Sequence, residues 1–238
     1  KEIRSLLGRM RMRLRDRQIH QLMPEGFHGD QHLIRVVADL VQHGAGHFVE
    51  TGTNVGSTLR YVAKTYPKLN CISCEPSKEA FAEANKNTAE LKNVTIHNES
   101  SQKFLKRLAS QYQQLYKERV IFWLDAHGYG FDWPLKEEID FIMSNFTNAY
   151  ILIDDFKVPH IEAFEYDVYG HYICSYDFIK DAIPAGVSHK VYYPDYEEHT
   201  SSFHPKRGWG LLVVGAPTDF LEANDKMIEA GQIVASKK

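Results

Sequence analysis

Three aspartates stand at the ends of two apolar stretches of the sequence, where their carboxylates could bind a metal ion. Asp125 ends the stretch VIFWLD, and Asp154 and Asp155 end the stretch ILIDD. Adjacent carboxylates repel each other and are costly to desolvate, so they need a compensating cation. If both stretches are parallel strands of one sheet, their carboxyl ends meet at one edge. Oxygen-only ligands suit a hard divalent ion, so the three carboxylates predict a Mg²⁺ site.

Neighbouring side chains extend this hypothesis, and simpler interpretations stay open. His127 lies two residues after Asp125, and its ordinary pKa of ~6.5 suits proton removal near neutral pH. It is predicted as a general base, although it could instead line the pocket or coordinate the ion. Asp125 could bind a cofactor amine or cap a helix, and the Asp154–Asp155 pair could be an exposed strand end. Lys157 could contact substrate or remain solvated.

A glycine turn, VETGTNVGST, joins an apparent strand to an apparent helix. Gly52 and Gly56 permit tight turning and close backbone approach, and the helix N-terminus offers free N–H groups. The dinucleotide pattern G-x-G-x-x-G is broken here, because Ser57 stands where its last glycine would be. Glu75 ends the next strand, where an acidic side chain can accept hydrogen bonds from both hydroxyls of a ribose. The pattern suits a nucleoside-containing cofactor, and the glycine turn alone could also be an ordinary turn between a strand and a helix.

The elements that must position these residues alternate along the chain. Short apolar strands are predicted at 46–51, 70–76, 94–99, 119–127, 149–156, 189–194 and 208–215, and helices at 30–44, 58–67, 77–91, 101–116 and 134–146. Strands that alternate with helices of ten or more residues indicate βαβ units and a mostly parallel sheet. The strand ends that carry the acidic residues therefore share one edge.

Two motifs resemble those of a known family. Glu50-x-Gly52-x-x-x-Gly56 resembles motif I of the class I S-adenosylmethionine (SAM)-dependent methyltransferases. An Asp after the fourth strand and an acidic pair after the fifth resemble the metal triad of the cation-dependent O-methyltransferases, of both the catechol and the macrolide sugar types. The resemblance covers roughly residues 46–156 and is weaker through 216.

The resemblance implies a fold, a cofactor and an activity. The fold would be α/β and Rossmann-like, with a mostly parallel seven-stranded sheet, helices on both faces and an antiparallel last strand. SAM would be bound, and Mg²⁺ held by Asp125, Asp154 and Asp155 would assist O-methylation of a small hydroxylated substrate, such as a sugar or a glycosylated natural product. The sugar-type relatives have an acidic residue in the place of His127, so the histidine is a departure. The expected SAM contacts are Glu50, Gly52, Thr53, Asn54, Gly56, Ser57, Glu75, Ser100, Ser101 and Asp125.

The domain organisation is predicted as an arm followed by one domain. Residues 1–30 would form a basic helical arm, which could contact a second copy of the chain or an anionic partner. Residues 31–238 would form the SAM-binding domain. Insertions at about 157–180 and 194–208 are rich in aromatic and polar residues and would cover the substrate. The expected substrate contacts are Lys157, Tyr166, Tyr169, Tyr196 and His199.

Composition excludes several classes of protein. A net charge of −3 without a broad basic stripe argues against nucleic acid as a partner. The sequence contains no run of ~18 apolar residues, so no membrane span is predicted. Three cysteines do not make a disulfide scaffold. Cys71 and Cys74 lie three apart on a predicted strand and face opposite sides, which indicates buried thiols. With no signal-peptide pattern, a cytoplasmic location is expected.

Two other functions remain open at this point. A metal-independent methyltransferase of the same fold would use His127 alone. A non-catalytic module could bind a nucleotide or a nucleotide sugar through the glycine turn, with the basic arm docking a partner. Activity that is insensitive to chelators would select the metal-independent enzyme. Tight binding of nucleotides without binding of SAM would select the binding module.

Overall fold

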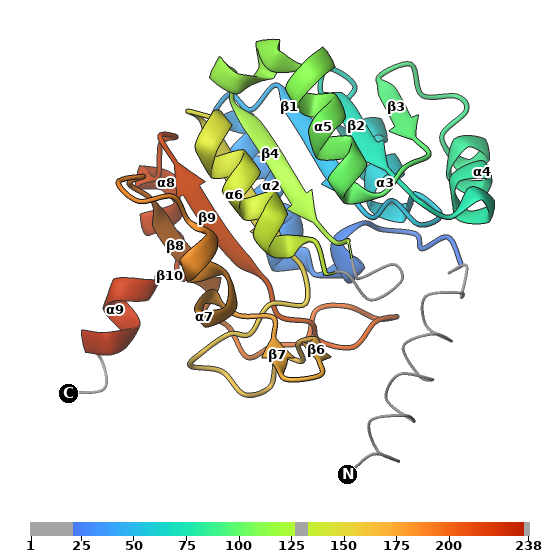
Figure 1. The fold of residues 1–238 in the computed structure, drawn as a ribbon. Coiled ribbons are helices and arrows are strands. Elements are labelled where there is room, and N and C mark those ends of the chain that lie inside the picture. The colour runs from blue at the N-terminus through green and yellow to red at the C-terminus, as the bar shows by residue number, and fades with distance from the viewer. Residues whose placement is uncertain (1–20, 127–132, 236–238) are drawn as a thin grey trace.

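A mixed sheet of eight strands runs through the centre of the molecule, in the order β10-β8-β9-β5-β4-β1-β2-β3 (Figure 1). The structure is a computed structural model and describes residues 21–126 and 133–235. The strands of the sheet are β1 His47–Thr51, β2 Asn70–Cys74, β3 Val94–His97, β4 Val120–Leu124, β5 Ala149–Ile153, β8 Lys190–Pro194, β9 Gly210–Val214 and β10 Met227–Glu229. A separate hairpin pairs β6 Val168–Tyr169 with β7 Tyr172–Ile173.

Helices cover both faces of the sheet. Those described are α2 Gln31–Gln42, α3 Ser57–Thr65, α4 Lys78–Asn87, α5 Ser101–Gln111, α6 Leu135–Asn145, α7 Tyr176–Ile179, α8 Asp219–Glu222 and α9 Ala230–Ala235, with short 3₁₀ turns η1 Phe27–Gly29, η2 Gln113–Lys117 and η4 Lys180–Ala182. In Figure 1, α5 and α6 lie on one face and α2 lies on the other. None of the described helices has both the length and the apolar character that crossing a bilayer requires.

The strands form because their apolar runs are covered on both sides. Every residue of β4 and of β5 is buried, as parallel strands between two helical layers require. The apolar face of α2 packs on the sheet through Leu33, Val36 and Leu40, whose relative exposures are 2% or less. Burial of such side chains stabilises the fold by roughly 1.5–3 kcal/mol each.

The register of the parallel strands brings four chain segments to one edge. Thr51 of β1 pairs with Cys74 of β2 and with Leu124 of β4, and Leu124 pairs with Ile153 of β5. The residues that follow these positions therefore leave the sheet side by side. In Figure 1, the β6–β7 hairpin and the segment before α2 lie at this same end of the sheet.

The predicted Rossmann-like, mostly parallel sheet is confirmed, and two of its details differ. The sheet has eight strands rather than seven, because β10 pairs antiparallel with β8 at the edge. Strand β9 is antiparallel to both of its neighbours, as expected of the predicted last strand. Strands β6, β7 and β10 have two or three residues each, too few for a periodic pattern to predict. Most of the predicted basic arm, residues 1–20, lies outside the described residues, so its oligomer contact stays a prediction.

The three cysteines are expected to be inert in the folded protein. Cys71, Cys74 and Cys174 are free and buried, and burial raises the pKa of each thiol, that of Cys71 to about 12. Because the thiolate is the reactive form, a disulfide reagent at pH 8 should label none of them before unfolding and all three in denaturant. Rapid labelling of the native protein would show that at least one of the three thiols is not buried as described.

Candidate functional site

A cavity of about 630 Å³ opens at the carboxyl edge of the parallel strands. Its walls come from the glycine turn, from the ends of β2, β4 and β5, and from the segments around His28, Tyr166 and Arg207. Most of the predicted cofactor contacts line it: Glu50, Gly52, Thr53, Asn54, Ser57, Glu75, Ser100, Ser101 and Asp125. Gly56 lies behind them, at the N-cap of α3.

The glycine turn has the backbone conformation that its sequence indicates. Gly52 has φ +85°, and a Cβ added there would clash with the main-chain oxygen of Asp125. Gly56 has φ +83°, and Asn54 between them has φ +49°. Positive φ is unstrained for glycine and tolerated by Asn. The turn therefore lies against the end of β4 with no side chain between them.

Glu75 lies beside the glycine turn, at the end of β2. Its Oε2 accepts a hydrogen bond from Asn54 N at 2.7 Å, and its Oε1 accepts one from Ser77 N at 2.8 Å. The side chain is buried, and burial raises its pKa despite these two donors. Each carboxylate oxygen has two acceptor sites, so each can accept a further hydrogen bond from a diol in the cavity.

Glu50 lies deeper, at the floor of the cavity. It is only 1% exposed, and the Ser73 hydroxyl donates to its Oε2 at 2.8 Å. Burial raises the pKa of Glu50 well above its usual range, and the nearby Asp125 and Glu75 carboxylates add to this. Burial therefore favours the neutral form of Glu50, which can both donate and accept a hydrogen bond.

The free energy of unfolding of wild-type protein is expected to fall as pH rises, because of Glu50. Glu50→Gln should remove this part of the pH dependence. A raised native pKa means that the folded state holds a proton which the unfolded state releases above pH ~4.5, so wild-type stability falls above that pH. The free energy of unfolding of the variant, relative to that of wild type, should therefore rise by up to about 1.4 kcal/mol per pH unit between pH 5 and 7. Urea unfolding at pH 5, 6 and 7 measures this, with the exposed Glu90→Gln as the control. A difference that does not vary with pH would place the Glu50 carboxylate in contact with water.

Two serines contribute the wall after β3. Ser100 is the N-cap of α5 without a side-chain capping bond, and Ser101 donates through Oγ to the buried Glu138 on α6. Both line the cavity. Both are among the SAM contacts that the sequence predicts.

The Asp154–Asp155 pair, at the end of β5, is compensated by two basic side chains. Asp154 and Asp155 are 3% and 5% exposed. His28 Nε2 lies 2.7 Å from Asp154 Oδ2, and Arg207 Nε lies 3.2 Å from Asp155 Oδ1. Burial opposes the charge on His28, but Asp154, with smaller contributions from Asp125 and Asp155, raises its pKa to about 9. Asp155 also has φ +50°, an uncommon conformation for a residue other than glycine.

His28 is a site residue that the sequence does not predict. It belongs to η1, where Phe27 and His28 have φ of +54° and +56°. Phe27 is fully buried and packs edge-to-face on Trp123 of β4 with 5.0 Å between ring centroids. Its N–H donates to the Thr58 hydroxyl at 3.2 Å. Burial of Phe27 thus holds the next side chain, His28, over the end of β5.

A second imidazole stacks on the first. The rings of His28 and His204 are parallel to within 20°, with centroids 4.1 Å apart. Burial and the charge of His28 lower the pKa of His204. His204 Nδ1 lies 3.1 Å from Pro205 O and donates to it, which leaves Nε2 as the unprotonated nitrogen. His204 and Arg207 both come from the insertion predicted at 194–208, and both line the cavity.

The predicted metal ligands do not all converge in the described part of the chain. There, the group of three metal-ligating side chains with donor atoms within 4.8 Å of one another is His28, Asp154 and Asp155. Asp125 lines the same cavity but is not in this group. Its main chain lies against Gly52, on the side of the cavity where the cofactor is predicted. His127 lies outside the described residues.

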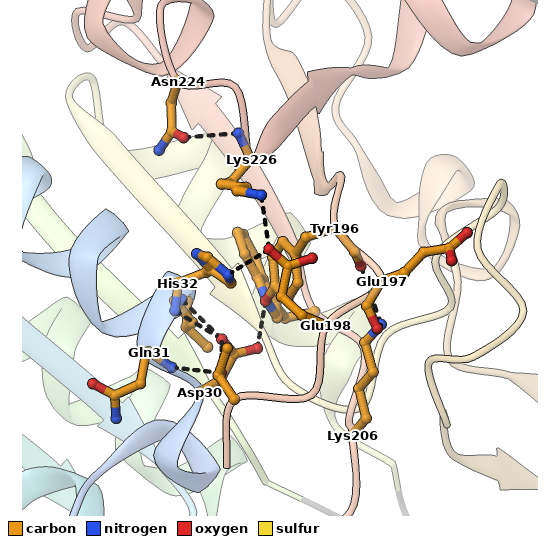
Figure 2. Close-up of polar contacts among 12 residues, drawn as sticks. Asp30, Gln31, His32, Tyr196, Glu197, Glu198, Lys206, Asn224 and Lys226 are labelled. Carbon is orange, nitrogen blue, oxygen red and sulfur yellow. Dashed lines mark hydrogen bonds and ion pairs between the residues drawn. The ribbon is translucent and has the colours of Figure 1, made fainter.

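A polar network joins the segment before α2 to the 194–208 insertion (Figure 2). Asp30 caps α2 by accepting from His32 N and Leu33 N, and it also accepts from the Tyr196 hydroxyl. Trp209 Nε1 donates to that same hydroxyl at 3.1 Å. The network holds the segments that carry His28 and His204 in fixed relation to each other.

The predicted substrate residues separate into two groups. Tyr166 and Tyr169 line the cavity, and Tyr169 donates to Asp167 at 2.9 Å. Tyr196 is only 4% exposed and is not among the residues that line the cavity, because its hydroxyl is used by Asp30 and Trp209. His199 lines a smaller adjoining hollow, and Lys157 lies behind Tyr166, with Nζ 5.5 Å from the ring centroid.

Comparisons with known proteins support the fold. Neither a protein-family model nor a curated protein matches the sequence. Among solved structures, an O-methyltransferase from Bacillus cereus in complex with SAH is 14% identical, with 87% of this chain and 88% of that one aligned at a TM-score of 0.55. TomG, an O-methyltransferase of Streptomyces achromogenes involved in tomaymycin synthesis and solved with SAM, is 14% identical over 76% of this chain and 78% of its own, at a TM-score of 0.50. The chain therefore has the fold of class I methyltransferases.

Proposed function

We propose that this chain is a SAM-dependent methyltransferase that methylates an oxygen of a small hydroxylated acceptor, a sugar or a glycosylated natural product. The observation that carries the proposal is the position of Glu75. Its carboxylate accepts from Asn54 N, within the glycine turn, and from Ser77 N, and it lines the same cavity as the turn. This arrangement suits the ribose of a nucleoside, with the rest of the cofactor along the turn.

The cavity has room and polarity for the cofactor. Its volume of about 630 Å³ lies within the usual range of ligand pockets, roughly 300–1,000 Å³. Glu75 would accept from the ribose hydroxyls, and Ser100 and Ser101 would contact the adenine. Glu50 and Asp125 would surround the amino group, and Gly52 leaves the backbone open to the amino-acid part. SAM supplies an activated methyl group on a sulfonium.

The acceptor would bind between the cofactor and the end of β5. Tyr166 and Tyr169 line this part of the cavity and offer aromatic faces and hydroxyls that suit a sugar ring. Holding the acceptor oxygen in line with the methyl group is the main contribution that such a pocket makes to the rate. Asp154 and Asp155, with Asp125 as the predicted third ligand, would hold a divalent cation. That ion would lower the pKa of an acceptor hydroxyl.

An imidazole would remove the acceptor proton. His127 keeps this predicted role, and His204 is the candidate among the described residues. With Nδ1–H donated to Pro205 O, Nε2 of His204 can accept a proton. A metal-independent reaction of the same type is the second candidate, because the charges of Asp154 and Asp155 are already countered by His28 and Arg207.

The proposed function is tested first by calorimetry with SAM and with its demethylated product, SAH. Binding of both, followed by methyl transfer to members of a panel of sugars and glycosides, is the expected result. Parallel assays with EDTA separate the metal-assisted from the metal-independent reaction. Tight binding of nucleotides without any heat from SAM would instead select the non-catalytic binding module.

A further inference from the structure

We propose that His28, Asp154 and Asp155 form a mixed nitrogen–oxygen site for a first-row transition-metal ion, with Mn²⁺ as the ion to test. The inference rests on the proposed function, because it assigns the cation to the acceptor side of the same cavity. It replaces the predicted ligand Asp125 with a histidine from outside the strands. The site then differs in chemistry from an all-carboxylate Mg²⁺ site.

The distances suit a shared ion. One donor atom from each of the three side chains lies within 4.8 Å of the others, and His28 Nε2 is 2.7 Å from Asp154 Oδ2. Adjacent ligand atoms around an ion with bonds of about 2.1 Å are separated by about 3.0 Å in octahedral geometry. A small outward movement of His28 would therefore admit the ion. The ion takes the place of the proton that Nε2 now shares with Asp154, and that proton leaves to solvent.

The donor types select the class of metal. Mg²⁺ is bound through oxygen and keeps several waters, whereas imidazole favours transition-metal ions. Two carboxylates with one imidazole leave three positions of an octahedral ion for water or for two hydroxyls of an acceptor. Both aspartates are almost completely buried, so the negative charge that Asp154 regains when the shared proton leaves is poorly screened by solvent and attracts the cation.

The surrounding residues hold the ligands in place. Buried Phe27 holds the turn that carries His28. Arg207 lies 3.2 Å from Asp155 Oδ1 and 3.4 Å from Asp167 Oδ1, and these two contacts orient the Asp155 carboxylate. Such supporting contacts are typical of metal ligands in proteins.

Electron paramagnetic resonance of Mn²⁺ tests the site without any measurement of catalysis. Titration of wild-type protein should remove the signal of free Mn²⁺ with one ion bound per chain, and a hundredfold excess of Mg²⁺ should not restore it. Electron spin-echo modulation should show a directly bound ¹⁴N. Loss of a residue that only supports a metal ligand typically weakens binding by about 10–100-fold, so His28→Gln should weaken it at least that much and remove the nitrogen modulation, and Asp154→Asn should abolish binding. The exposed His171→Gln is the matched control and should behave as wild type.

Several outcomes would overturn the assignment. These are no Mn²⁺ binding at millimolar concentration, ready displacement by Mg²⁺, or nitrogen modulation that persists in His28→Gln. Wild-type protein that binds Mn²⁺ without nitrogen modulation would overturn it too, and that measurement does not depend on the folding of any variant. Calorimetry with SAM on the same samples separates the two proposals. SAM binding without Mn²⁺ binding overturns only the metal site, whereas Mn²⁺ binding through His28 without SAM binding overturns only the methyltransferase function.

Discussion

Glu75→Ala is expected to lower the affinity for SAM by about 10²–10⁴-fold. The side chain would lose two charge-assisted hydrogen bonds to the ribose hydroxyls, each contributing about 1.5–3 kcal/mol. It would also release Asn54 N–H and Ser77 N–H, both of which donate to Glu75 in the unliganded protein. Calorimetric titration with SAM measures the loss directly.

Two further variants make this result specific. Glu75→Gln keeps the shape but presents an NH₂ group where an acceptor is needed, so its affinity should fall between those of wild type and Glu75→Ala. Glu90→Ala removes an exposed glutamate just beyond α4 and should bind SAM as wild type does. If Glu75→Ala retains wild-type affinity and a wild-type melting temperature, the cofactor does not use this wall of the cavity.

Asp155→Asn is expected to lower the rate of methyl transfer by about 10³-fold or more, with little change in SAM affinity. The carboxylate is placed to hold the cation that would activate the acceptor, and such an ion contributes several kcal/mol to the transition state. Asn is the appropriate replacement because Asp155 has φ +50°, a conformation that Asn accepts readily. Folding should therefore be preserved. The measurement is kcat with saturating SAM.

Controls separate chemistry from stability in this experiment. Asp140→Asn changes an exposed aspartate of α6 and should leave kcat unchanged. Melting temperatures of both variants should stay within a few degrees of wild type. A full rate in Asp155→Asn, together with a full rate in EDTA, would remove the cation from the mechanism and favour the metal-independent reaction.

The sequence predicts the sheet and one half of the site for the same reason. Parallel strands carry continuous apolar runs and end together, so the sequence alone places Gly52, Glu75 and Asp154 at one edge of the sheet. The short strands β6, β7 and β10 give no such signal. Their pairing depends on contacts with distant parts of the chain rather than on local pattern.

The other half of the site comes from irregular backbone. His28 contacts Asp154 across 126 residues of sequence, from a turn in left-handed conformation that follows neither the helical nor the strand period. The flanking Gly26 and Gly29 are the one local signal of a tight turn there. Tyr196 was predicted at the substrate because it is aromatic and lies in a polar loop, but Asp30 and Trp209 draw its hydroxyl into the interior.

The hydrogen bond between Asp30 and Tyr196 spans 166 residues of sequence and joins the two segments that carry His28 and His204. The hydrogen bond between Asn54 of the glycine turn and Glu75 spans only 21 residues of sequence. During synthesis, the cofactor half can therefore assemble as soon as the first strands pair, whereas the acceptor half must wait for almost the whole chain.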